Sequence, residues 1–201
     1  VSSAVYSQNF SVAAQDTSPT DLAFNNDGTK MFVTGGTGDS VYEYNLSSGF
    51  DVSSAVYSQS VLISVDTSPI AITFNADGTK MFILGYTDKD VNEYTLSSGF
   101  DVSSASFVDS FSVSAQDTGP TGLAFNTDGT KMFITGNTGN DINEYDLSSS
   151  FDVSTSVYSQ NFSVVAQDIS PRGITFNNDG TKMFITGDTN DAVYEYYLTP
   201  S

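Results

Sequence analysis

A twelve-residue stretch that occurs four times constrains the fold of this chain more than any other feature. It reads FNNDGTKMFVTG from Phe24, and close copies begin at Phe74, Phe125 and Phe176. Apolar residues flank a central Asp-Gly pair, in which the glycine accepts the positive φ that a tight reversal between two strands requires. Each stretch therefore predicts a β-hairpin. An EF-hand calcium loop would need further oxygen ligands and a Glu twelve residues along, and Lys30 stands in the hairpin instead.

The repeat extends well beyond the hairpin. Equivalent prolines are spaced 50, 51 and 51 residues apart, at Pro19, Pro69, Pro120 and Pro171. Each copy offers four strand candidates, which in the first copy are residues 5–12, 20–24, 30–34 and 41–46. Four short antiparallel strands in a repeat of about 50 residues are typical of a β-propeller blade, whereas a β-solenoid usually repeats faster.

We therefore expect an all-β protein, a β-propeller with four blades per chain and four antiparallel strands in each blade. Residues 1–201 form a single domain in this interpretation, and its repeats cover about 1–51, 52–101, 102–152 and 153–201. The aromatic residues, 11 Tyr and 15 Phe, have the bulk to fill the wedge-shaped spaces between blades.

The two ends of the sequence are out of phase with the hairpins. The chain starts with an outer-strand sequence, residues 5–12, and finishes with a third-strand sequence, residues 193–198. Pairing of the two would complete the last blade, close the ring and leave no open sheet edge. Two arrangements satisfy this expectation: a closed four-bladed monomer, which we favour, or a ring of eight blades shared by two chains.

Composition excludes several classes of function. The chain has 6 Lys and Arg against 24 Asp and Glu, a net charge of −18, which disfavours nucleic acids and anionic membrane surfaces as partners. It has no Cys, so disulfides and thiolate metal sites are excluded, and no His, the commonest general base. No apolar run approaches the length of a membrane span.

The order of features in each copy resembles a known repeat family. A proline, an apolar strand, an Asp-Gly turn, a KMF[VI]xG strand and a VYEY-type strand are similar to the YVTN and YncE-like β-propeller repeats. The resemblance covers nearly the whole chain and implies a propeller. Family members usually have about seven blades, so four blades depart from the family pattern. The resemblance implies no activity, because lactonase-type relatives use His chemistry that this chain cannot supply.

Strand order places two sets of loops at one end of the propeller: residues 16–20 and 35–40, with their counterparts in the other copies. These loops differ between copies, whereas the Asp-Gly turns at the other end are nearly uniform. Variation on a rigid scaffold is typical of a contact surface, although drift in unconstrained loops produces the same pattern. The candidate ligand-binding residues are Asp21, Tyr86, Asp88, Lys89, Asp90, Asn137, Asn140, Asp141, Arg172, Asp188 and Asp191.

A carboxylate recurs before each proline at the same end, in Asp16, Asp66, Asp117 and Asp168. We favour an Asx-type turn that holds the loop. The alternative is a ring of carboxylates around the channel mouth that binds Ca²⁺; no other cofactor is expected. Arg172, the single Arg of the chain, is expected to pair with Asp21 or a neighbouring loop Asp as a rim contact. The Glu residues recur once per copy inside a strand and are interpreted as structural.

These observations favour a non-enzymatic binding, adhesion or scaffold module, secreted or on the cell surface, with a small polar ligand or a protein as its partner. The alternative is a metal-dependent hydrolase or lyase of the propeller type that uses the Asp-rich loops. That alternative is disfavoured because no nucleophile–base pair is visible in the sequence.

Overall fold

The computed structural model describes residues 5–198 and consists almost entirely of short strands. Blade 1 contains β1 (Pro19–Phe24), β2 (Lys30–Gly35), β3 (Ser40–Leu46) and β4 (Ala55–Leu62). Blade 2 contains β5 (Pro69–Phe74), β6 (Lys80–Gly85), β7 (Asp90–Leu96) and β8 (Ala105–Ser112). Blade 3 contains β9 (Pro120–Phe125), β10 (Lys131–Gly136), β11 (Asp141–Leu147) and β12 (Ser156–Ser163). Blade 4 contains β13 (Pro171–Phe176), β14 (Lys182–Gly187) and β15 (Ala192–Tyr197).

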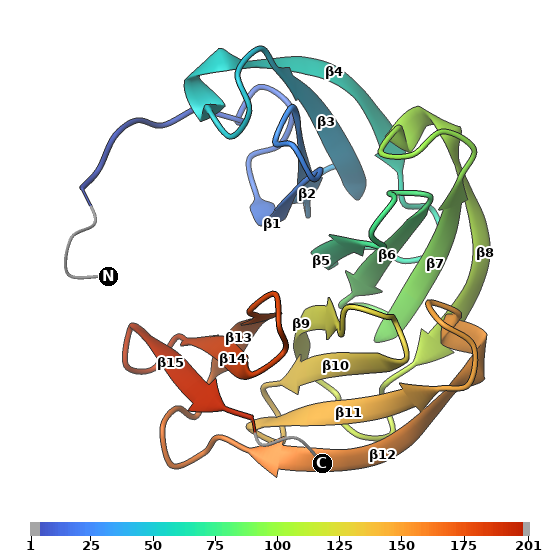
Figure 1. Ribbon diagram of the computed structural model, residues 1–201, viewed down its shortest axis with the longest axis vertical. Helices are drawn as coiled ribbons and strands as arrows, with labels where there is room; N and C mark the ends of the chain where they lie inside the picture. The colour runs from blue at the N-terminus through green and yellow to red at the C-terminus, as the bar shows by residue number, and fades with distance from the viewer. Residues whose placement is uncertain (1–4, 199–201) are drawn as a thin grey trace.

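Each blade is one antiparallel sheet whose strands follow one another in chain order, as in β1-β2-β3-β4. The blades succeed one another around a common centre, with the first strand of each blade innermost and the fourth outermost (Figure 1). Three single 3₁₀ turns, η1 (Val52–Ser54), η2 (Val102–Ser104) and η3 (Val153–Thr155), lie in the connectors that lead to the outer strands. The predicted all-β propeller with four blades is confirmed. No helix within residues 5–198 has the length and apolar character needed to cross a membrane.

The Asp-Gly stretches form the predicted hairpins, and their turns repeat in detail. In blade 1, Gly28 has a φ of 70° and its three counterparts have φ values of 69–70°. Asp27 accepts a hydrogen bond from the Thr29 amide at 3.0 Å, and Asn25 accepts one from the Lys30 amide at 2.9 Å. A side chain at Gly28 would also collide with the ring of Phe50, so both the backbone and the packing require glycine there.

Aromatic pairs connect each blade to the next. The rings of Phe32 and Phe74 lie 4.6 Å apart, those of Phe82 and Phe125 lie 4.5 Å apart, and those of Phe133 and Phe176 lie 4.7 Å apart. The second strands are buried on both faces, as expected for sheets that lie between other sheets. Repetition of one pair at three junctions indicates that the same packing angle is used each time.

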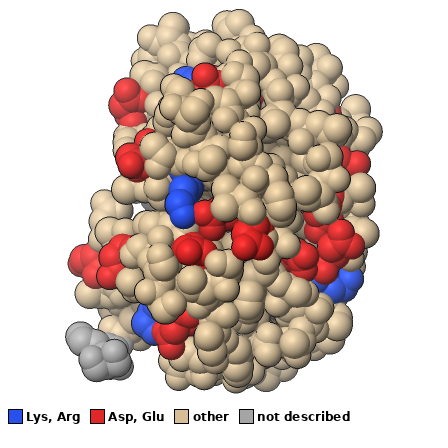
Figure 2. All heavy atoms as spheres, turned by 90° about the vertical axis from the view of Figure 1, so that its right-hand side faces the viewer, with Lys and Arg blue, Asp and Glu red and all other residues tan. Residues whose placement is uncertain are grey.

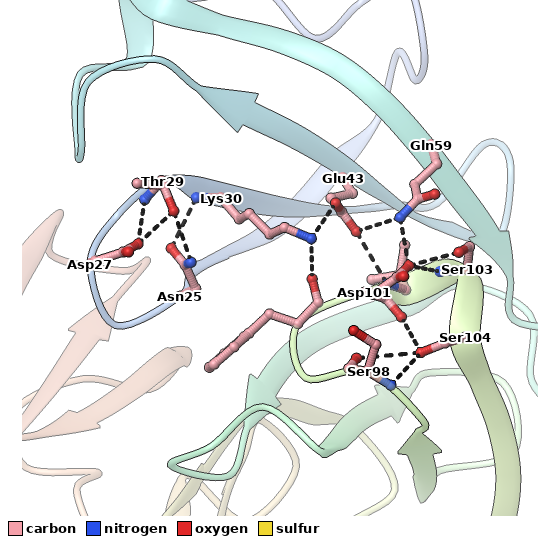
Figure 3. Close-up of polar contacts among 12 residues, drawn as sticks. Asn25, Asp27, Thr29, Lys30, Glu43, Gln59, Ser98, Asp101, Ser103 and Ser104 are labelled. Atoms are coloured by element: carbon pink, nitrogen blue, oxygen red, sulfur yellow. Dashed lines mark hydrogen bonds and ion pairs between the residues drawn. The ribbon is translucent and has the colours of Figure 1, made fainter.

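Buried ion pairs tie the connectors to the preceding blade (Figure 3). Lys30 donates to Glu43 at 2.8 Å and to the carbonyl oxygen of Phe100 at 2.7 Å, and Glu43 also accepts the Val102 amide at 3.1 Å. Blade 2 repeats the arrangement through Lys80 and Glu93, which accepts the amide of Val153 at 3.0 Å. The structural interpretation of the recurring Glu residues therefore agrees with their contacts.

One expectation about ring closure is not met within a single chain. β15 pairs with β14 alone among residues 5–198, and residues 5–12 form no strand. These residues instead lie against blade 1, where Gln8 donates to Asp51 at 2.5 Å and Phe10 packs edge-on against Tyr44. The physical reason is distance, because blade 1 and blade 4 lie apart, so residues 5–12 beside blade 1 do not reach β15 (Figure 1).

Candidate functional site

The two predicted sets of loops do lie together at one end of the molecule. In blades 1 to 3 a threonine before the first strand contacts a threonine of the loop between the second and third strands. The hydroxyl oxygens of Thr17 and Thr37 are 3.3 Å apart, and those of Thr67 and Thr87 are 2.9 Å apart. We call this surface, formed by residues 13–18 and 36–39 and their counterparts, the loop end.

Three of the four recurring aspartates hold these loops through backbone amides. Asp16 is buried and accepts the amides of Ser18 at 2.7 Å and Gly38 at 2.8 Å. Burial acts to raise the pKa of Asp16, but the hydrogen bonds from Ser18, Gly38 and Thr37 outweigh it and the net pKa is lowered. Asp117 and Asp168 accept equivalent amides in blades 3 and 4. This is the geometry that the Asx-turn interpretation predicts.

Asp66 differs from its three counterparts. The amide of Ser68, which would be its partner by analogy, donates instead to Asp39 of blade 1 at 2.7 Å. One carboxylate oxygen of Asp66 is buried without a partner, and so are the amide nitrogen of Asn92 and the hydroxyl of Tyr94 in the same blade. Burial raises the pKa of Asp66 to about 6, although the hydrogen bond from the Asp88 amide opposes that rise. The second copy is one residue shorter just before Asp66, which accounts for the altered turn.

The recurring aspartates do not meet at the channel mouth. Each one is enclosed by the loops of its own blade, and no group of three or more acidic side chains positioned for a metal ion occurs within residues 5–198. Calcium binding by Asp16, Asp66, Asp117 and Asp168 therefore gains no support from this geometry and stays a prediction.

The loop between β6 and β7 presents the most distinctive side chains of the loop end. The Tyr86 side chain is 52% exposed, and the Lys89 ammonium lies 6.0 Å from the centre of its ring. Lys89 sits at a positive φ of 59° and donates to the carbonyl of Thr87 at 3.1 Å. Asp88 lies in the same loop, and its amide contacts Asp66 at 3.3 Å. Asp90 begins β7 and is half-buried. The geometry thus offers an aromatic ring, a cation and a carboxylate on one turn.

Lys89 also stands apart in the charge distribution. The other five cations each form a salt bridge with Asp or Glu, whereas no carboxylate within residues 5–198 lies within 4.0 Å of Lys89. Figure 2 shows the pattern on one face, where acidic side chains are numerous and the few basic ones lie beside them. Lys89 is therefore the cation available for an external partner.

Four further candidates make contacts or adopt backbone conformations that support their own loops. Asp141 is buried at the start of β11 and accepts hydrogen bonds from Asn143 at 2.9 Å and Asn161 at 2.6 Å. Asn140 and Asp191 occupy the positive-φ position of their turns, at 52° and 50°. Asn137 lies in the same loop as Asn140, and its amide donates to the Gly119 carbonyl at 2.9 Å.

Arg172 forms the expected rim contact, but with a different partner from the first one proposed. Its guanidinium donates to Asp188 of the same blade at 2.7 Å, and both side chains are half-exposed. The pairing with Asp21 is wrong. Asp21 instead accepts the amide of Ile72 in blade 2 at 2.9 Å, and burial raises its pKa although the bonds from Ile72 and Leu22 oppose that rise. The choice of a neighbouring loop Asp is confirmed.

A large hollow that the sequence did not indicate opens on the other end of the molecule. Its volume is about 1270 Å³, and its walls come from the inner strands, the Asp-Gly turns of blades 3 and 4, and the β12 and β15 strands. Lys131, Glu144 and Gln160 line it. The lysines at the same position in blades 1 and 2, Lys30 and Lys80, each donate to a carbonyl of the connector that leads to the outer strand of the next blade. The hollow lies at the equivalent place between blades 3 and 4. Only the recurrence of Lys and Glu in the sequence could have signalled it.

No protein family model matches the sequence, and no curated protein matches it. Solved structures do match. A candidate 6-phosphogluconolactonase from Bacteroides uniformis superposes with a TM-score of 0.66 at 15% identity, covering 90% of this chain and 50% of its own. The periplasmic gluconolactonase of Pseudomonas aeruginosa superposes with a TM-score of 0.59 at 15% identity, covering 90% of this chain and 50% of its own. The β-propeller domain of Cps50 (Swd1) from Myceliophteria thermophila superposes with a TM-score of 0.60 at 8% identity, covering 90% of this chain and 54% of its own.

These comparisons establish a propeller fold and nothing finer. The identities are low, and the chain spans about half the length of the structures that it matches. A propeller hosts many unrelated functions, so a shared fold does not transfer an activity. The resemblance to YVTN and YncE-like repeats stays a prediction.

Proposed function

We propose that this protein is a binding module, and that its contact surface is the loop end with the β6–β7 loop at its centre. The observation that carries the proposal is the combination of exposed Tyr86 with Lys89, the cation without a carboxylate partner among the described residues. Tyr and a free cation are residues that interfaces favour, because one provides contact area and the other a charge-assisted hydrogen bond.

The rigidity of the surrounding loops supports the proposal. Asp16, Asp117 and Asp168 each fix a pair of loops through two or more backbone amides, so the loops of blades 1, 3 and 4 are held in one shape before any partner arrives. In blade 2 the Tyr86 amide donates to the Ser68 carbonyl at 3.1 Å, which holds the start of the β6–β7 loop. Preorganisation reduces the entropy lost on binding. The partner is a small polar ligand or a protein that offers a carboxylate or carbonyl group to Lys89 and a flat face to Tyr86. A secreted or surface-attached protein is the setting we propose for such a module.

The test is a screen of the labelled protein on glycan and peptide arrays, followed by titration calorimetry of each hit. We expect Tyr86→Ala and Lys89→Ala to weaken binding at least tenfold. Val56→Ala, on the outer strand of blade 1, is the matched control because Val56 is also an exposed apolar residue but lies outside this loop, and it should bind as the parent does. Hits that survive both loop substitutions but disappear when Asn26 or Asn178 of the Asp-Gly turns is changed would contradict the assignment.

A second candidate function is a propeller-type hydrolase, and it is suggested by the names of the gluconolactonase neighbours. The test measures the rate of lactone hydrolysis by the purified protein, in one series without Ca²⁺ and in another with added Ca²⁺. This candidate requires that the parent hydrolyse the lactone faster than the Asp66→Asn and Asp21→Asn variants do. Equal rates for parent, variants and buffer would remove this candidate and leave the binding module.

A further inference from the structure

Blade 4 carries an uncovered face. Val193 is 67% exposed on β15, whereas its counterparts Val41 and Val91 are fully buried by the following blade. Tyr197, at the end of the same strand, is 77% exposed. The outer edge of β15 is also unpaired among residues 5–198, so its backbone N–H and C=O groups are open to another strand.

Blade 1 carries the complementary uncovered face. Leu22 is 56% exposed on β1, whereas its counterpart Ile72 is 4% exposed beneath the preceding blade. Phe24 holds the position that Phe74, Phe125 and Phe176 hold in the other blades, where each of those rings contacts a Phe from the second strand of the preceding blade. Phe184 is the second-strand Phe of blade 4, and among residues 5–198 no blade follows that would supply a first-strand Phe to pack against it.

Residues 5–12 are already placed as the outer strand of a blade that would precede blade 1. Gln8 contacts Asp51 just as Gln59 of β4 contacts Asp101 at 2.7 Å in the next blade. Phe10 packs edge-on against Tyr44 at 5.5 Å, as Phe162 of β12 packs against Tyr196 at 5.5 Å. The contacts on one side of the segment are therefore those of an outer strand, and its strand-pairing side is unused.

The register for that pairing can be read from the complete blades. β3 pairs with β4 so that Glu43 faces Gln59 and Asn45 faces Val56. The Gln59 amide donates to Glu43 at 2.9 Å, and Gln160 donates to Glu144 at 3.0 Å. Transferred to β15, the same register sets Glu195 opposite Gln8 and Tyr197 opposite Val5. Both segments are present in the chain, but residues 5–12 and β15 lie on opposite sides of the opening in Figure 1.

We propose that a second copy of this chain fills the opening, so that two chains join head to tail in one ring of eight blades. Residues 5–12 of each chain complete blade 4 of the other, and Phe184 packs against the partner's Phe24. A two-fold axis along the channel makes the two junctions identical, which satisfies both uncovered faces and leaves no open edge. The junction repeats the contacts that already join neighbouring blades within the chain.

The curvature of the chain favours a second copy over closure within one chain. The four blades superpose on about half of several longer propeller-like chains, as they would if they formed about half of a ring. Three equivalent Phe pairs join the successive blades, and with these pairs in place blade 1 and blade 4 lie apart, so closure within one chain would require the junctions to change (Figure 1). In the shared ring the two loop ends face the same side, so two copies of the Tyr86 loop surround one channel mouth.

Cysteine pairing tests the proposal directly, because the chain has no Cys of its own. One batch of protein carries Val5→Cys and a second carries Tyr197→Cys; both positions are exposed, so the folds are preserved. Facing residues on paired strands lie within the range that a disulfide spans. After mixing the two batches, partial unfolding to exchange chains, refolding and mild oxidation, we expect a disulfide-linked heterodimer, and little cross-linking of either variant alone.

The double variant with both substitutions separates the remaining arrangements. A shared ring gives chains linked to one another, whereas a ring closed within one chain gives a disulfide inside a monomer and overturns the proposal. An open monomer gives no disulfide in either experiment and overturns it as well. Asn45→Cys with Val56→Cys is the positive control, because these residues face each other within blade 1 and must form an internal disulfide.

Discussion

At the scale of single residues, equivalent positions in the four blades act as controls for one another. Asp16, Asp117 and Asp168 bond to amides of their own loops, and Asp66 has lost that partner because the Ser68 amide turned to Asp39. The same residue type at the same repeat position therefore holds the loops of three blades and is poorly accommodated in the fourth. Two predictions about single residues follow from the hydrogen-bond and ion-pair partners of each side chain rather than from its residue type.

The first concerns Asp66. Its folded-state pKa is about 6 against an ordinary value of 3.8, so the folded protein binds this proton more tightly than the unfolded chain. Its contribution to the free energy of unfolding is favourable at low pH and is lost as the pH rises from about 4 to 6. We expect Asp66→Asn to stabilise the protein relative to the parent by an amount that grows across this interval, measured by urea unfolding at several pH values.

Asp16→Asn is the matched control for that experiment. The pKa of Asp16 is lowered, so its contribution is present above the ordinary value of 3.8 and lost below it. The variant should therefore be less stable than the parent at pH 7 and approach it as the pH falls below 4. Parallel curves for the two variants would contradict the distinct roles assigned to the two carboxylates.

The second concerns the ion pair between Arg172 and Asp188. Both side chains are half-exposed, so solvent screens the attraction and the pair contributes about 1 kcal/mol or less to stability. We expect Arg172→Ala to change the urea midpoint only slightly, and to change it less still in high salt. A loss of several kcal/mol would show that Arg172 supports the fold in another way.

At the scale of elements, the sequence predicts what is local and misses what depends on distant partners. The Asp-Gly hairpins were predicted because the turn chemistry of Asn25, Asp27 and Gly28 is complete within six residues. The partner of Ser68 and that of Arg172 could not be predicted, since both depend on the position of a loop in space. The hollow between blades 3 and 4 was missed for the same reason.

The Lys–Glu–connector contacts provide the prediction at this scale. Glu93 is buried, pairs with Lys80 and accepts the amide of Val153. Glu93→Ala removes the buried carboxylate of the pair and leaves the Val153 amide without its acceptor, and we expect a loss of about 1–3 kcal/mol in the free energy of unfolding. Asp146 also pairs with a lysine, Lys131, but is exposed, so Asp146→Ala should cost far less. Equal costs for both variants would contradict the importance of burial at Glu93.

At the scale of the whole molecule, the four repeats form four blades, and the main structural feature is that these blades do not close a ring among residues 5–198. The sequence alone favoured a closed monomer over a shared ring, and both arrangements use the same strand pairing. In the structure the two uncovered faces, on blade 1 and blade 4, do not meet, and the shared ring is the arrangement that we propose (Figure 1). A prediction from local sequence could not contain the position of one blade relative to another.

The most direct measurement is the mass of the protein in solution, by light scattering after size-exclusion chromatography across a range of concentrations. The chain has a mass of 21.4 kDa, and the shared ring predicts a species of twice that mass that persists on dilution to low micromolar concentration. Gln8→Lys with Leu22→Lys places charges at both junctions and should convert that species to single chains. A mass of 21.4 kDa for the unaltered protein at every concentration would contradict the shared ring.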